Sequence, residues 1–115
     1  MFLNTHTYYS LRYGSISPKD VVSIAKTHNI SEIALTDINS TTAGLDFVKL
    51  AIENDIKPIL GVDFRNGVCQ KFIMLAKSEL GYRHINTYLS SFLHNTKIEI
   101  PDTATSFPDT YVIYP

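Results

Sequence analysis

Two aspartates, Asp37 and Asp63, lie near the ends of two predicted strands, where their side chains could bind a ligand or take part in catalysis. Asp37 follows the apolar run 33–36, Asp63 lies near the end of a second run, 57–64, and a segment with helical spacing, 41–54, separates the two runs. This order predicts a strand, helix, strand unit, and ligands of parallel α/β folds gather at the carboxyl ends of the strands. The two carboxylates could be metal ligands, acid and base groups, or remnants of a site.

Each candidate residue also has a purely structural interpretation. His6 ends a short β-favouring segment, 2–6, and is either a metal ligand or a strand-end histidine hydrogen-bonded to a neighbour. Asp37 precedes the polar run 39–42, so it could cap the next helix or brace the loop through backbone N–H groups. For Asp63, a functional carboxylate and a solvent-facing carboxylate at a strand end are both open.

The remaining reactive residue types give weaker signals. His28 and His84 fall in helical patterns, where a structural histidine is expected. Cys69 has no neighbouring histidine or basic cluster that would lower its pKa, so a nucleophile is not expected there. Gly61 and Gly67 are isolated, and the chain contains no glycine-rich phosphate loop.

Length and composition indicate one small globular domain over residues 1–115. The chain is 44% hydrophobic, and its 10 basic and 11 acidic residues are scattered, for a formal charge of −1. A single cysteine excludes an internal disulfide, which favours the cytoplasm. No run approaches the roughly 18 apolar residues of a membrane span, so no membrane partner is expected.

The elements that must position these residues can be read from periodicity and from helix-start signals. Ser17 followed by Pro18 predicts a helix start, and Ser78 a second one. The expected elements are strands at 2–6, 33–36, 57–64, 71–76 and 111–114, and helices at 17–29, 41–54 and from 78 onward. Val21, Val22, Ala25 and His28 recur at helical spacing and predict one buried face. Helical spacing also relates two further sets: Leu45, Val48, Ala51 and Ile52; and Leu80, His84, Ile85, Tyr88, Leu89 and Phe92. A turn at 65–67 predicts that the third and fourth strands form a hairpin.

The chain stops one residue after the apolar strand at 111–114. Parallel α/β sheets normally continue from such a strand into a covering helix. We therefore expect a truncated or divided domain.

Four stretches in register resemble the PHP domain, the metal-dependent phosphoesterase-type domain at the N-terminus of bacterial DNA polymerase III α subunits. They are residues 4–14 (NTHTYYSLRYG), 33–37 (IALTD), 55–64 (DIKPILGVDF) and 74–83 (MLAKSELGYR). The resemblance implies an α/β fold of parallel β/α units, the first half of a distorted seven-stranded β/α barrel with a metal cluster at the carboxyl ends of its strands.

The resemblance also implies that the metal site is degenerate. Of the family's first histidine pair, this chain keeps His6 but has Asn4 in the other place. Tyr13 stands where the family has an acid, Ile38 where it has a histidine, and Asp63 where it has a glutamate. Because imidazoles and carboxylates supply most of such a coordination shell, these losses predict severely reduced metal affinity. No cofactor is expected, with zinc or manganese as the alternative.

The resulting hypothesis is a non-catalytic or residual PHP-type domain with a structural role in DNA replication. Its parent would be a DNA-directed DNA polymerase, and its partners the remainder of that chain and other polymerase subunits, with DNA reached only through the parent. One alternative is a metal-dependent phosphoesterase using His6, Asp37 and Asp63. Another is a free-standing α/β module that binds a protein. Exposed sheet edges also make a homo-oligomer conceivable.

Overall fold

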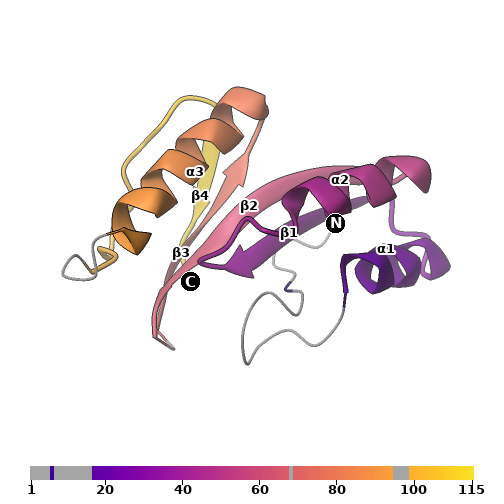
Figure 1. Cartoon of the computed structure of the whole chain (residues 1–115), viewed down its shortest axis with the longest axis horizontal. Helices are drawn as coiled ribbons and strands as arrows, with labels where there is room; N and C mark the ends of the chain where they lie inside the picture. The colour runs from indigo at the N-terminus through magenta and orange to yellow at the C-terminus, as the bar shows by residue number, and fades with distance from the viewer. Residues whose placement is uncertain (1–5, 7–16, 68, 95–98) are drawn as a thin grey trace.

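A four-stranded mixed sheet with three helices forms the part of the chain that the structure describes. The structure is a computed structural model and describes residues 6, 17–67, 69–94 and 99–115. The elements are α1 (Pro18–Thr27), β1 (Glu32–Ile38), α2 (Gly44–Glu53), β2 (Lys57–Asn66), β3 (Cys69–Ala76), α3 (Glu79–Leu93) and β4 (Thr110–Ile113) (Figure 1). The strand expected at 2–6 lies outside the described residues, except for His6.

The strands follow one another in the sheet in chain order, β1-β2-β3-β4. β1 and β2 are parallel and joined through α2, which confirms the predicted strand, helix, strand unit. β2 and β3 form the predicted antiparallel hairpin, although Arg65 and Asn66 belong to β2 rather than to the turn. β4 pairs with β3, again antiparallel. The fold is therefore α/β, and its sheet remains open among the described residues.

Serine caps set the start of two of the three helices. Ser17 accepts a hydrogen bond from the Asp20 backbone N–H at 3.1 Å, with Pro18 at the first helical position. Ser78 accepts from the Gly81 N–H at the start of α3. α2 has Ala43 at its N-cap and no side-chain cap. None of the helices in these stretches is long and apolar enough to cross a membrane.

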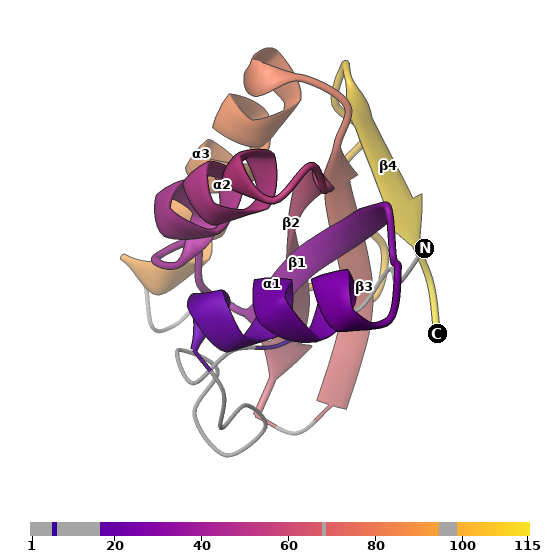
Figure 2. The ribbon, with the colours of Figure 1, turned by 90° about the vertical axis from the view of Figure 1, so that its right-hand side faces the viewer.

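The two faces of the sheet have different coverings (Figure 2). Residues on one face pack against the helices, with Ile33 and Leu35 of β1 joining α1 and α2, and Val62 and Phe64 of β2 joining α3. The opposite face carries a small apolar cluster of Ala34, Ile73 and Leu75, with Ile59 and Ile113 packed against it. Among the described elements no helix covers this second face, which we call the open face.

The buried faces of the helices were predicted only in part. Val21, Val22, Ala25, Ile85 and Leu89 are buried as expected. His28, expected on a buried face, is exposed, and so are Leu45 (82%), Ile52 (63%) and Leu80 (47%), which share the helical spacing. In α2 the buried residues are Ala51, which belongs to the expected helical pattern, and Gly44 and Phe47, which do not. A helix that packs on one face of a sheet buries only a narrow stripe of its surface. Where a helix carries more apolar residues than that stripe holds, spacing alone does not show which of them face the core.

Candidate functional site

The register of β1 and β2 separates the two candidate carboxylates. Asp37 pairs with Val62, whereas Asp63 pairs with Ile38. Paired residues of adjacent strands point to the same face, and successive residues of a strand alternate between faces. Asp37 therefore lies on the helix-covered face and Asp63 on the open face. The two carboxylates are offset by one residue in the ladder and so lie on opposite faces of the sheet.

Asp37 lies in the interior between the sheet and the start of α2. It is 2% exposed and lines a cavity of about 10 Å³ with Leu35, Thr41, Leu60 and Tyr82, about the room for one water molecule. Burial raises the pKa of Tyr82, whose hydroxyl donates to the Thr41 carbonyl at 3.4 Å. The N-cap residue of α2 is Ala43, so Asp37 is not the N-cap of this helix, and its role as a brace of the loop stays a prediction.

Asp63 is the centre of a buried polar cluster on the open face, formed with His6 and Arg65. Its Oδ2 accepts hydrogen bonds from His6 Nε2 at 3.0 Å and from Arg65 Nε and Nη2 at 3.2 and 2.9 Å. A carboxylate oxygen only accepts, so His6 carries its hydrogen on Nε2. Asp63 is 0% exposed, His6 14% and Arg65 13%. The interpretation of Asp63 as a solvent-facing carboxylate is wrong, while His6 does bond a neighbour.

The surroundings of Asp63 favour its charged form. Burial raises the pKa of this carboxyl group, but hydrogen bonds from His6 and Arg65, the nearby Gln70 amide and the charge of Arg65 together outweigh burial. The net effect lowers the pKa of Asp63 below its usual value. Asp63 is therefore an anion at neutral pH, neutralised by the guanidinium of Arg65.

Sequence reasoning missed Arg65, which it assigned to a turn. Asp63 and Arg65 are two residues apart on one strand and so share a face, and this spacing was the signal that could have revealed the pair. Arg65 is held by Asn39, whose side-chain amide donates to the Arg65 carbonyl at 2.8 Å and accepts from the Arg65 N–H at 3.0 Å. Asn39 has a positive φ of 48° and also donates its own N–H to the Asp63 carbonyl.

A bulge in the hairpin decides which side chain lies opposite Arg65. The register moves from Phe64 opposite Phe72 to Arg65 opposite Gln70, so Lys71 is an extra residue in β3. Lys71 instead forms an ion pair with Asp102 at 2.6 Å. The bulge places a neutral amide opposite Arg65, where an unbroken register would place a second cation.

The described residues do not fit a divalent metal at this place. Structural and catalytic metals in proteins take three or more side-chain or backbone ligands, and no group of three His, Cys, Asp or Glu residues occurs among the described residues. Ile38 lies opposite Asp63, and a guanidinium already contacts Oδ2. The buried Asp63 Oδ1, which has no hydrogen-bond partner there, is the one atom left to accept a cation. Asn4 and Tyr13 lie outside the described residues.

Comparison with known proteins gives a family match across nearly the whole chain. The model of the PHP domain family matches residues 3–110. The chain is 34% identical over 119 aligned residues to the DNA polymerase III subunit alpha of Borreliella burgdorferi, covering 87% of this chain and 10% of that protein. It is 32% identical over 120 residues to the same subunit of Mycoplasma genitalium, covering 98% and 13%. The chain thus spans about a tenth of the length of these relatives.

Solved structures share the fold at lower sequence identity. An amidohydrolase from Chromobacterium violaceum, solved with bound sulfate and no metal, superposes with a TM-score of 0.63 at 21% identity, over 80% of this chain and 32% of that chain. A candidate metal-dependent phosphoesterase from Bifidobacterium adolescentis gives 0.59 at 20% identity, over 84% and 35%. At this identity the likeness concerns the arrangement of strands and helices.

Proposed function

Because this chain belongs to the PHP domain family, we propose that it serves as a non-catalytic PHP domain of a DNA polymerase III alpha-like protein, with a structural role in DNA replication. Residues 1–115 would form the first part of that domain, in the cytoplasm. The similarity to DNA polymerase III alpha subunits over most of this chain supports the assignment to a polymerase.

The observation that carries the non-catalytic part of this proposal is the pairing of Ile38 with Asp63. In the parallel pair, the place on the open face next to Asp63 holds an apolar side chain, while Asp37 is directed to the other face. The two parallel strands therefore bring one carboxylate to the open face rather than a set of ligands. Phosphoryl chemistry by metal ions needs several oxygen or nitrogen ligands around each ion.

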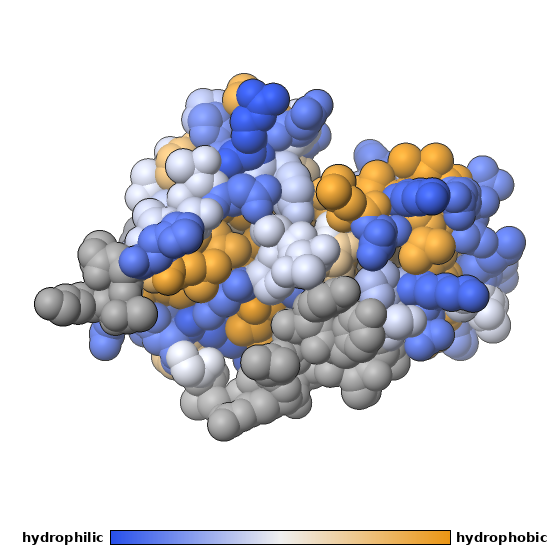
Figure 3. Space-filling view, in the orientation of Figure 1, coloured by the Kyte–Doolittle hydropathy of each residue, from blue (hydrophilic) through white to orange (hydrophobic). Residues whose placement is uncertain are grey.

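A structural role requires a surface that other parts of a polymerase could cover. Leu45 and Ile52 are largely exposed on α2, and Figure 3 shows apolar surface gathered over this helix. In relatives that are about ten times longer, the matched segment is one part of a much longer chain. We propose the remainder of the polymerase chain as the first partner, other polymerase subunits as further ones, and DNA only through the polymerase. Self-association through the sheet edges stays a prediction.

The second candidate function is a metal-dependent phosphoesterase. The observations that favour it are the His6 to Asp63 contact and the unpartnered Oδ1 of Asp63, which together keep an imidazole and a carboxylate in one place. With zinc or manganese, further ligands would have to come from residues outside the described stretches. The described residues by themselves supply two ligands, His6 and Asp63.

The two candidates are separated by metal analysis and by hydrolysis of bis(p-nitrophenyl) phosphate. Purified chain would be tested with EDTA, Zn²⁺ or Mn²⁺, beside a His6→Ala variant and a His28→Ala control, since His28 is exposed and outside the cluster. We expect no stoichiometric metal and equal background rates in all three proteins. Metal-dependent turnover that is lost in His6→Ala and kept in His28→Ala would overturn the non-catalytic proposal.

A further inference from the structure

The cluster on the open face contains a cation that belongs to the chain itself. We propose that Arg65 is a resident counter-cation, which takes the place of a metal ion as the charge partner of Asp63. This inference rests on the proposed function, because it explains the charge balance of a PHP site without bound metal. It concerns the role of Arg65, which the resemblance to the family does not supply.

The first support is the convergence of donors on one atom. Arg65 Nε and Nη2 and His6 Nε2 all lie within 3.2 Å of Asp63 Oδ2. A metal bound through this oxygen would have to replace the guanidinium contacts and displace the hydrogen of His6 Nε2, since a metal ligand nitrogen must be free of its hydrogen. The guanidinium and a metal ion are thus mutually exclusive at Oδ2.

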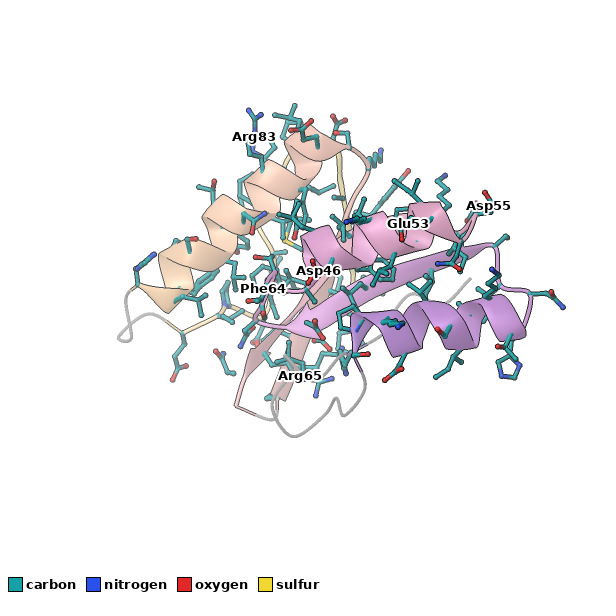
Figure 4. All side chains as sticks on the ribbon, turned by 45° about the vertical axis from the view of Figure 1, so that its right-hand side comes forward. Asp46, Glu53, Asp55, Phe64, Arg65 and Arg83 are labelled. Carbon is teal, nitrogen blue, oxygen red and sulfur yellow. The ribbon has the colours of Figure 1, made fainter. Side chains whose placement is uncertain are left out.

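The second support is that the backbone around Arg65 is fixed by contacts that serve its placement. Asn39 holds both the N–H and the carbonyl of Arg65, and its own N–H bonds the Asp63 carbonyl. The side chain of Asn39 therefore ties the end of β1 to Arg65, and its backbone N–H ties it to Asp63. Figure 4 shows Arg65 near the hairpin end of the sheet, far from Arg83 at the start of α3.

The third support is that, among the described residues, Arg65 is the one lysine or arginine in contact with Asp63. The bulge turns Lys71 toward Asp102 and sets the neutral Gln70 opposite Arg65. Arg65 is 13% exposed and Asp63 0%, so solvent screens their attraction only weakly. Arg65 balances the charge of Asp63, so a divalent ion added beside this pair would bring positive charge that neither of the two residues offsets.

The test uses the metal ion alone as the probe of Arg65→Gln. Thermal unfolding of the purified chain would be followed in EDTA and in Mn²⁺ or Zn²⁺. We expect no response to metal in the wild type, in Arg65→Lys, or in the control Arg83→Gln, whose side chain is exposed. In Arg65→Gln, the amide oxygen of the introduced side chain would join Asp63 and His6 as a third ligand, so metal at tenfold its Kd should raise the unfolding midpoint by roughly 5 to 10 °C. The response should vanish in Arg65→Gln combined with Asp63→Asn.

Two results would overturn the inference. One is an Arg65→Gln variant whose midpoint does not change with metal, and the other is a wild type that responds as strongly as the variant. If Arg65→Gln does not fold in EDTA, refolding with Mn²⁺ decides: recovery confined to Mn²⁺ supports the inference, and failure in both overturns it. Wild-type turnover would overturn the proposed function, whereas an unresponsive Arg65→Gln beside an inactive wild type overturns this inference alone.

Discussion

At the scale of residues, the charge of the buried Asp63 carboxylate is balanced by a side chain of the same strand, that of Arg65. Asp63 is fully buried, and its charge is compensated by Arg65 and by a hydrogen bond from His6. Breaking a buried ion pair by removing one partner typically destabilises a protein by about 3 to 5 kcal/mol, because the other charge remains uncompensated. The cluster therefore matters for the folding of this region as well as for its chemistry.

The lowered pKa of Asp63 predicts a loss of stability in acid. A carboxyl group whose pKa is lower in the folded than in the unfolded state stabilises the fold above its unfolded pKa, and this contribution is lost as pH falls through the folded value. The unfolded value is about 4, so we expect the loss below about pH 4. Urea unfolding from pH 7 to pH 2.5 would measure it.

Asp63→Asn provides the comparison for the acid experiment. The variant should be less stable at pH 7, because Arg65 loses its counter-charge, and its stability should fall less between pH 4 and 2.5 than that of the wild type. Parallel pH profiles for the two proteins would show that Asp63 does not titrate as inferred.

Substitution of Asn39 should reveal how much the amide bridge to Arg65 contributes. Asn39→Gly removes two hydrogen bonds but keeps the freedom to adopt a φ of 48°, for an expected cost of about 1 to 2 kcal/mol. Asn39→Ala adds the strain of a positive φ, for about 2 to 4 kcal/mol in total. Denaturant unfolding measures both, and equal stabilities of Asn39→Gly and the wild type would contradict a role for the amide.

At the scale of elements, helix starts and strand order were predictable, whereas register was not. Ser17 with Pro18 and Ser78 mark helix starts by local hydrogen bonding, which sequence records directly. Asp37 and Asp63 are offset because of the hydrogen-bonding register between β1 and β2, and no short-range sequence pattern predicts that register. Arg65 was missed for the same reason, because the extension of β2 through Asn66 depends on pairing with β3.

The close approach of β2 and β3 predicts a large effect of Gly61→Ala. A Cβ at Gly61 would collide with the backbone carbonyl of Met74, which cannot move without disturbing the ladder. We expect destabilisation of about 3 kcal/mol or more by denaturant unfolding. Gly67→Ala is the control, since a Cβ there meets nothing within 4 Å and its positive φ alone should cost about 1 kcal/mol. A smaller effect at Gly61 than at Gly67 would contradict the strand spacing.

At the scale of the whole molecule, side-chain amides connect segments that are distant in sequence. Asn66, at the end of β2, donates to the Ile100 carbonyl at 2.6 Å and accepts from the Ile100 N–H at 3.0 Å. Ile100 is buried, and farther along the same connection Phe107 stacks on His84 of α3 at 5.5 Å between ring centres. The described part of the connection between α3 and β4, residues 99–109, is thereby tied to β2 and to α3.

Asn66→Ala should loosen this segment more than it changes the rest of the molecule. We expect faster amide hydrogen exchange at Ile100 and its neighbours, with α1 and β1 little affected, because the lost bonds connect only the hairpin and the C-terminal segment. Asn86→Ala is a matched control, since its amide donates to a carbonyl four residues away in the same helix, that of Tyr82. Uniformly faster exchange would indicate global destabilisation instead.

Because Arg65 is part of the chain, the charge partner of Asp63 does not depend on the metal content of the cell. A metal ion stabilises a fold by mass action, so its contribution rises and falls with the free concentration of that metal. A guanidinium two residues from Asp63 is present at an effective concentration fixed by the geometry of one strand. The charge balance of this site should therefore be the same in a metal-starved cell as in a metal-rich one.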